Sequence, residues 1–319
     1  MIISYDNGMS NGKLFFKYKD KEYEIDFNSR VKELGSEAVD CLVINGKYYT
    51  FNEGRIAAQL GHNAKDNDVH RILLYKAMYE AYKVTGETKF DIITNCSLDS
   101  YKIDEGKSVM DVQSKFKEIK IKEGFVNKEV KFTINQIIVL PECLSGSLTT
   151  DLKLKEEDVV VIDIGSKNIQ LLQISQGRVQ YDTSYATRYG MNNILMGSAD
   201  LVKVHEPMLK SSDAIQMYLE KTNNGSFGII NEVDELILRY LMTNIFTEID
   251  ERLNEMDIKL FTKYVFLGGG SIALKRFLEA KFEGKSISFV KNPYFANARG
   301  LYMKGVKMIN KSKSKNKVG

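Results

Sequence analysis

Two short segments of the chain share the same spacing of a carboxylate, a glycine and an asparagine. Residues 6–11 and residues 163–168 both read Asp-x-Gly-x-x-Asn, and each segment lies between two apolar runs. A carboxylate at the end of a buried strand is costly to desolvate unless it has a function. The glycine lets a turn approach a ligand and direct its amides toward phosphate. The matched pair predicts a site for a Mg²⁺-bound polyphosphate, because Mg²⁺ keeps waters and bridges carboxylates to phosphate oxygens.

Three further features lie at the ends of expected strands, one where a strand begins and two where a strand finishes. Lys13 begins the strand after the first segment, where it is either a point charge directed at phosphate or an exposed strand lysine. Glu142 follows an apolar run and Pro141, so it either orients or deprotonates an attacking water or is an ordinary loop carboxylate. Residues 268–271, Gly-Gly-Gly-Ser, join an apolar run to a helical pattern, and such a junction lets a nucleotide lie against the backbone.

Composition and charge narrow the class of protein. The chain has 319 residues, of which 43% are hydrophobic and 27% are charged, as is typical of a soluble globular protein. A formal net charge of +3 gives no argument for direct contact with nucleic acid. The basic run that begins at Lys311 is expected to form a solvated, flexible tail over residues 311–319.

Membrane and secretory classes are not expected. No apolar run approaches the ~20 residues that span a bilayer, and the chain begins directly with a strand pattern that leaves no room for an amphipathic anchor. Cys41, Cys96 and Cys143 have no metal-binding spacing, and Cys41 and Cys96 lie in apolar runs typical of buried thiols. An odd number of cysteines without a secretory leader favours the reducing cytoplasm.

The elements that must position these residues alternate between strands and helices. A meander of strands opens each half of the chain, and the polar stretch 151–157 is the expected boundary between the halves. Residues 205–231 are polar and are expected to be irregular. The clearest helical patterns cover Asp68–Val84, Met191–Val202, Glu232–Met256 and a terminal stretch that starts at Pro293. This alternation predicts a layered α/β fold.

Taken in order, the motifs resemble those of the actin/hexokinase/chaperone ATPase superfamily. They are Asp-x-Gly-x-x-Asn-x-Lys, Pro-Glu, a second Asp-x-Gly-x-x-Asn, Gly-Gly-Gly-Ser and Asn-Pro-x-x-Ala-Asn-Ala-x-Gly. Within this superfamily the chain is most similar to the ParM/StbA plasmid-segregation actins. Val139–Glu142 and Asn292–Leu301 are the most ParM-like segments, and the resemblance covers essentially the whole chain.

The resemblance implies a duplicated α/β fold of the actin/hexokinase type, which is ribonuclease H-like, with two domains around a nucleotide cleft. Domain I would cover residues 1–157, with a C-terminal helix at 294–312 packing back on it. Domain II would cover residues 158–293 and include a helical insertion at about 190–260.

The resemblance also implies a role for each motif residue. Asp6 and Asp163 would contact Mg²⁺ through water, and Glu142 would be the hydrolytic glutamate. The other residues implied to bind nucleotide are Gly8, Asn11 and Lys13 in a first phosphate loop, Gly165, Ser166 and Asn168 in a second, and Gly268, Gly269, Gly270 and Ser271 on the sugar and base side. The sequence departs from the family pattern at Met9, Gly12 and Cys143.

The implied function is a cytoplasmic actin-like ATPase that polymerises on binding Mg²⁺ and ATP, or GTP, and is destabilised by hydrolysis. Its expected partners are other copies of itself and a small DNA-bound adaptor of the ParR type, through which it would segregate plasmid or other replicon DNA. No direct contact with nucleic acid or membrane is expected. The alternatives are a metabolic kinase of the same superfamily and a non-hydrolysing scaffold that nucleotide switches between shapes.

Overall fold

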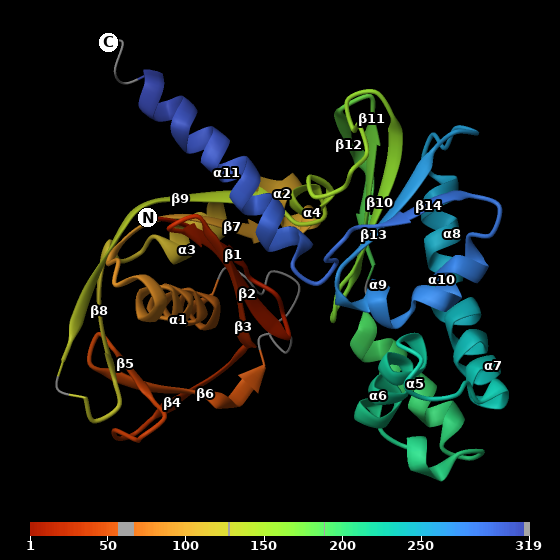
Figure 1. The fold of residues 1–319 in the computed structure, drawn as a ribbon, viewed down its shortest axis with the longest axis horizontal. Coiled ribbons are helices and arrows are strands. Elements are labelled where there is room, and N and C mark those ends of the chain that lie inside the picture. Colours follow the sequence, from red (N-terminus) through yellow and green to blue (C-terminus); the bar gives the residue numbers. More distant parts are fainter. Residues whose placement is uncertain (57–66, 127, 188, 316–319) are drawn as a thin grey trace. The chain divides into compact units, whose positions relative to one another are not determined.

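The computed structural model describes residues 1–56, 67–126, 128–187 and 189–315. The chain divides into two compact units, of which unit 1 is Met1–Leu148 with Asn297–Gly319 and unit 2 is Thr149–Ala296. Each unit contains one β-sheet and its own helices (Figure 1).

Unit 1 is built on a nine-stranded sheet over the described residues, in the order β3-β2-β1-β7-β9-β8-β5-β6-β4. Its strands are β1 (Ile2–Asp6), β2 (Asn11–Tyr18), β3 (Lys21–Asn28), β4 (Arg30–Leu34), β5 (Leu42–Ile44), β6 (Lys47–Ile56), β7 (Lys89–Cys96), β8 (Glu118–Glu123) and β9 (Val130–Pro141). The strands β1, β7 and β9 are parallel neighbours, so their carboxyl ends lie at one edge of the sheet.

Unit 2 is built on a five-stranded sheet over the described residues, in the order β12-β11-β10-β13-β14. Its strands are β10 (Asp158–Ile164), β11 (Ile169–Ser175), β12 (Arg178–Ala186), β13 (Lys263–Leu267) and β14 (Ser286–Phe289). The central strand β10 is buried along almost its whole length, as expected for the apolar run that precedes the second Asp-x-Gly motif.

The two sheets repeat one topology. In each, an antiparallel meander of three strands is extended by two parallel strands on the other side of the first strand: β3-β2-β1-β7-β9 in unit 1 and β12-β11-β10-β13-β14 in unit 2. When only these five shared strands are numbered in chain order, both sheets have the order 3-2-1-4-5. The predicted α/β class and the internal duplication are confirmed.

Helices cover both faces of the unit 1 sheet. The helix α1 (Asp68–Thr85) begins at the N-cap Asn67 and packs Leu73 and Leu74 in a core with Ile3 and Ile92. The opposite face of the same strands presents Ile93 to the C-terminal helix α11 (Figure 1). The alternation follows from the period of two along a strand, and it lets one sheet be buried on both sides. The shorter helices of unit 1 are α2 (Leu98–Asp104), α3 (Lys107–Gln113) and α4 (Leu144–Ser147).

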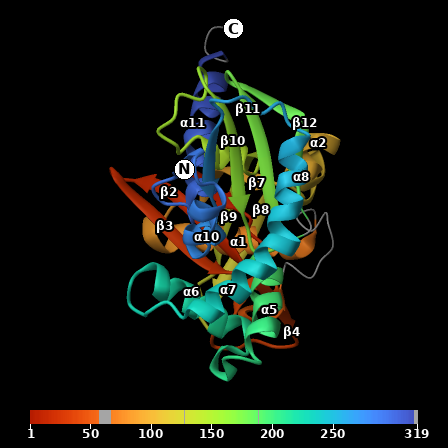
Figure 2. The ribbon, with the colours of Figure 1, turned by 90° about the vertical axis from the view of Figure 1, so that its right-hand side faces the viewer.

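The helices of unit 2 pack mainly on one core with β10, β11 and β13. They are α5 (Met191–Val202), α6 (Ser212–Asn223), α7 (Asn231–Tyr240), α8 (Thr247–Asn254), α9 (Gly269–Ala273) and α10 (Lys275–Lys281), and a 3₁₀ turn covers Pro207–Leu209. The predicted long helix from Glu232 is confirmed as α7 and α8, which a π-helical segment, Leu241–Phe246, joins into one rod (Figure 2).

The expectation that residues 205–231 are irregular is wrong for α6. Ser211 caps this helix by accepting a hydrogen bond from the Ala214 amide at 3.2 Å, and Asp213 lies in the first turn. Only a narrow stripe of the helix is buried, which is why its polar sequence gave a weak helical pattern.

The C-terminal helix α11 (Ala296–Lys315) extends beyond its expected end. Residues 311–315 of the expected tail are thus helical, and residues 316–319 lie outside the described part of the chain; the flexibility of the tail stays a prediction. The basic segment contains lysine, serine and asparagine but neither glycine nor proline before Lys315, so nothing in it breaks an established helix. Within the described ranges, none of the helices is sufficiently long and apolar to cross a bilayer.

Candidate functional site

The two Asp-x-Gly segments form equivalent hairpins. Asp6 is the last residue of β1 and pairs with Lys13 of β2, and Asp163 of β10 pairs with Gln170 of β11 in the same antiparallel arrangement. The two aspartates are 3% and 4% exposed, respectively. A buried carboxylate needs hydrogen-bond donors or a cation, so both positions require an explanation beyond turn formation.

In unit 1, both carboxylate oxygens of Asp6 accept hydrogen bonds. The Lys13 ammonium donates to Oδ2 at 3.2 Å, and Asn95 Nδ2 donates to Oδ1 at 2.6 Å. Asn95 lies near the carboxyl end of β7, the parallel neighbour of β1, and its Oδ1 accepts from the Asn7 amide at 3.0 Å. The Asn7 side chain in turn contacts His70 Nδ1 of α1. These contacts hold the first hairpin on the sheet.

The turn of the first hairpin has no room for a side chain at Gly8. A Cβ there would lie 2.3 Å from the Asn11 carbonyl oxygen and 3.4 Å from Lys13 Nζ. Ser29 Oγ fixes the turn by donating to the Gly8 carbonyl at 2.6 Å. Asn7 Nδ2 is buried beside this turn and has no hydrogen-bond partner among the described residues. The turn at Gly8 thus leaves the backbone open to close approach, as expected where a ligand contacts the chain.

Glu142 lies at the same edge of the unit 1 sheet. It follows Pro141, the last residue of β9, and its amide donates to the Cys96 carbonyl of β7 at 2.8 Å. Glu142 is 9% exposed. Because β1, β7 and β9 are parallel and adjacent, Asp6, Asn95 and Glu142 come from the carboxyl ends of three neighbouring strands, where α/β sheets bind ligands.

In unit 2, the triple-glycine loop lies against the second aspartate. Gly268 follows β13, the parallel neighbour of β10, and has φ 83°. A Cβ at Gly268 would lie 2.4 Å from Asp163 Oδ1, and one at Gly270 would lie 2.3 Å from the Ile164 side chain. Ser271 is buried, and its hydroxyl donates to the Gly268 carbonyl at 2.8 Å, which closes the loop on itself.

The helix α5 positions the second hairpin. The first amides of this helix, those of Met191 and Asn192, donate to the carbonyls of Gly165 and Ser166, each at 2.9 Å. Across the turn, the Gly165 amide donates to the Asn168 carbonyl at 3.0 Å. These bonds use the N-terminal amides of α5 to fix the turn. Burial lowers the pKa of the Lys167 ammonium in this turn.

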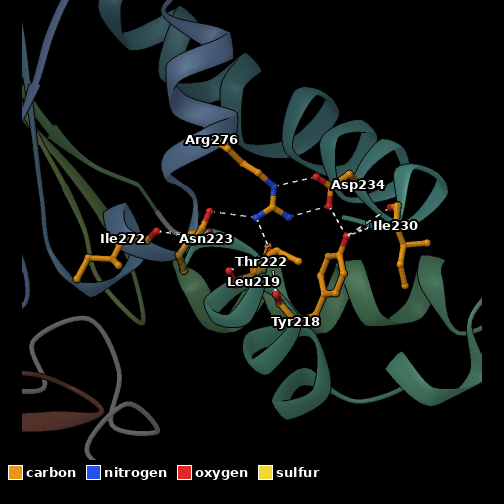
Figure 3. A network of polar contacts seen from close by, with 9 residues as sticks. Tyr218, Leu219, Thr222, Asn223, Ile230, Asp234, Ile272 and Arg276 are labelled. Carbon is orange, nitrogen blue, oxygen red and sulfur yellow. Dashed lines mark hydrogen bonds and ion pairs between the residues drawn. The ribbon is translucent and has the colours of Figure 1, made fainter. Parts of the chain in front are cut away.

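A polar network fixes α9 and α10, the helices that follow the triple glycine, to α6 and α7 (Figure 3). Arg276 of α10 forms a bidentate pair with Asp234 of α7 at 2.8 and 2.7 Å, and its Nη1 donates to Thr222 Oγ1 at 2.7 Å. Asn223 Nδ2 donates to the Ala273 carbonyl at 2.7 Å, at the end of α9. A bidentate arginine fixes orientation as well as distance. The network therefore fixes the position of the helices that follow the glycine loop.

The predicted site residues therefore form two groups, each within one unit. The unit 1 group contains Asp6, Gly8, Asn11, Lys13 and Glu142, and the unit 2 group contains Asp163, Gly165, Ser166, Asn168 and residues 268–271. The described residues contain no cluster of three or more His, Cys, Asp or Glu side chains that could hold a metal directly. Single buried carboxylates beside a close backbone turn fit a Mg²⁺ that is bound through waters.

Sequence reasoning missed the residues that support these groups. Asn95, Asn7 and His70 hold Asp6 and its turn, and Arg276 and Asn223 hold the helices after the glycine loop. The sequence of β7 gave no clear signal for Asn95, because this strand also contains Lys89, Asp91 and Thr94.

No family model and no curated protein matches the sequence. Solved structures do match it. The archaeal actin homologue Ta0583 is 19% identical, with 96% of this chain and 99% of that chain covered and a TM-score of 0.72. AlfA from the B. subtilis plasmid pLS32, solved as a filament, is 19% identical, with coverage of 95% and 98% and a TM-score of 0.62, and an AlfA filament bound to AMPPNP also matches. ParM from psk41 is 14% identical, with coverage of 98% of both chains and a TM-score of 0.67.

Proposed function

We propose that this chain, which has an actin-like fold, binds a magnesium nucleotide and assembles into filaments whose lifetime depends on hydrolysis. The observation that carries the proposal is the repeated hairpin: each half of the chain buries one aspartate at the same position of the same motif, beside a glycine turn. A fold alone does not define a function, but two matched carboxylates with close backbone turns suit a bound polyphosphate.

In this proposal both groups bind one nucleotide. Asp6 and Asp163 hold the Mg²⁺ through waters, and the ion neutralises charge on the phosphates when bound. Lys13 adds a second positive charge, and the turns at Gly8 and Gly165 donate backbone amides. The other proposed contacts are Asn11, Ser166 and Asn168 to phosphate and residues 268–271 to the sugar and base. Glu142 orients the attacking water, and its burial at the sheet edge supports a fixed position.

Filament formation and DNA segregation are the finer parts of the proposal. AlfA, one of the similar structures, comes from a plasmid and was solved as a filament, and an AlfA filament was solved with AMPPNP. By analogy, nucleotide binding favours the assembled state of this chain, hydrolysis weakens it, and a small DNA-bound adaptor of the ParR type links the filament to a replicon. The AMPPNP-bound relative favours ATP over GTP as the nucleotide.

The test is the dependence of hydrolysis on protein concentration. Phosphate release and light scattering are measured together with Mg-ATP or Mg-GTP, and with EDTA as the control. We expect both signals to rise above one threshold concentration and to vanish in EDTA, because neighbouring subunits complete the active state. Phosphate release that is strictly proportional to protein concentration, without scattering, would favour a kinase-like monomer. Scattering without phosphate release would favour the non-hydrolysing scaffold.

A further inference from the structure

The residue after Glu142 has a strained backbone. Cys143 has φ 63° and ψ −53°, and the Leu144 amide donates to the Glu142 carbonyl at 2.6 Å across it. This is a γ-turn with positive φ, a conformation that is rare and unfavourable for a residue with a side chain. The strain lies directly beside the carboxylate that is proposed to orient water. Such conformations persist only where surrounding contacts hold them.

One side chain of the C-terminal helix supplies those contacts. Asn297 Oδ1 accepts hydrogen bonds from the Cys143 amide at 3.2 Å, from Ser145 Oγ at 3.2 Å and from the Gly146 amide at 3.0 Å. Asn297 is 8% exposed, so these bonds are shielded from water. Backbone amides can only donate, which requires the carbonyl oxygen of Asn297, and not its NH₂ group, to face the turn.

The first turn of α11 also approaches the same loop too closely for a larger residue. A Cβ on Gly300 would lie 1.7 Å from the Ser145 carbonyl oxygen. The neighbouring Ala298 carbonyl accepts from Ser4 Oγ of β1 at 2.7 Å. The segment Asn297–Gly300 is thus fixed both to the strand that ends in Asp6 and to the turn that follows Glu142.

We infer that Asn297 is a positioning residue for Glu142. Its amide oxygen holds the strained turn at Cys143, and the turn fixes the backbone from which the Glu142 carboxylate extends. This inference rests on the proposed nucleotide hydrolysis. The three donors to Asn297 Oδ1 all lie in the loop that follows Glu142, so its loss should lower the hydrolysis rate and leave nucleotide affinity almost unchanged.

The experiment compares four substitutions by single-turnover hydrolysis and by nucleotide titration. Asn297→Ala removes the acceptor, and we expect about a tenfold lower hydrolysis rate with nucleotide Kd within about twofold of wild type. Asn297→Asp keeps an acceptor of the same size and should restore most of the rate. Asn310→Ala makes the same change at an exposed asparagine of the same helix and should have no effect. Glu142→Gln gives the rate without the catalytic carboxylate.

The Cys143→Gly variant serves as a second background, in which a positioning effect of Asn297 can be distinguished from a general effect on folding. Glycine adopts positive φ without strain, so Cys143→Gly should reduce the loss caused by Asn297→Ala from about tenfold to less than about threefold. Labelling of the Cys143 thiol, localised by mass spectrometry, gives a readout without hydrolysis. Cys143 and Cys96 are both fully buried, so Asn297→Ala should speed labelling of Cys143 relative to Cys96.

The results of these experiments distinguish a failure of the positioning inference from a failure of the proposed function. If wild type hydrolyses nucleotide and Asn297→Ala does so at the same rate, the positioning inference is wrong and the proposed function stands. If Asn297→Ala lowers rate and affinity together, and Cys143→Gly rescues neither, Asn297 is only structural and the inference is also wrong. If wild type neither binds nor hydrolyses nucleotide, the proposed function fails and the positioning role of Asn297 fails with it.

Discussion

Gly268 combines a backbone conformation and a contact that both exclude a side chain. Its φ is 83°, and a Cβ would lie 2.4 Å from Asp163 Oδ1. Gly284 has a similar φ of 76° but nothing within 4 Å of the same position. We expect Gly284→Ala to cost about 1 kcal/mol of unfolding free energy and Gly268→Ala at least about 2 kcal/mol more, because Asp163 or the loop must move.

Denaturant unfolding of the two variants measures this difference. The difference combines the contact with Asp163 and the backbone, because Gly268 has ψ 156°, a conformation that with positive φ is almost confined to glycine. If the two substitutions cost the same, the contact between the glycine loop and Asp163 is not part of the native structure. The site would then lose the feature that joins its two motifs in unit 2.

The sequence motifs identified the buried carboxylates but not the side chains that hold them and their turns by hydrogen bonds. Asp6 and Asp163 were predictable because a carboxylate after an apolar run is rare without a function. Asn95 and Asn297 were not, because each acts through a hydrogen bond to a residue far away in sequence, and no local pattern encodes that contact. The strain at Cys143 is likewise a backbone property that residue types do not reveal.

The hydrogen-bond network around Arg276 joins the helices α6, α7 and α10 of unit 2. This network should weaken at alkaline pH. Tyr218 of α6 donates a hydrogen bond to Asp234 at 2.8 Å, and burial together with that bond raises the pKa of its phenol to about 12. The raised pKa means that the folded protein holds this proton more tightly than the unfolded chain, whose tyrosines titrate near pH ~10.

The stabilisation from Tyr218 should therefore be complete below pH ~10 and be lost as the pH rises toward about 12. The measurement is the difference in unfolding free energy between wild type and Tyr218→Phe from pH 8 upward, in urea. We expect the wild type to lose its advantage progressively over this range. A difference that stays constant with pH would show that the Tyr218 proton is not held by Asp234.

Strong capping signals made some elements predictable, and weak apolar patterns hid others. The helix α1 has a side-chain N-cap at Asn67 and a C-cap at Gly86 with φ 74°, and its expected range is confirmed almost to the residue. The helix α6 was missed because its buried stripe is narrow and its sequence is polar. The helix α11 ends later than expected, because its charged C-terminal sequence contains no residue that breaks a helix.

For the whole molecule, the duplication was predictable because the same motif occurs twice at the start of two strand meanders. The structure confirms it as a repeated strand order with equivalent aspartates. The nine-stranded extent of the unit 1 sheet over the described residues was not predictable, because the pairing of β5 with β8, which brings Leu42 opposite Glu123, joins segments that are distant in sequence. Such pairings depend on tertiary packing more than on local pattern.

The proposed function requires that Asp6 and Asp163 act on the same magnesium nucleotide. The most direct test measures Mg-nucleotide affinity for Asp6→Asn, Asp163→Asn and the double variant, with the exposed Asp182→Asn as a control. Asparagine keeps the size of each side chain, so the fold should be retained. If the carboxylates hold one ion, each single change should weaken binding by at least about tenfold, and the double variant should be little weaker than either single variant. Unchanged affinity in the single variants, or losses that multiply in the double variant, would contradict a shared site.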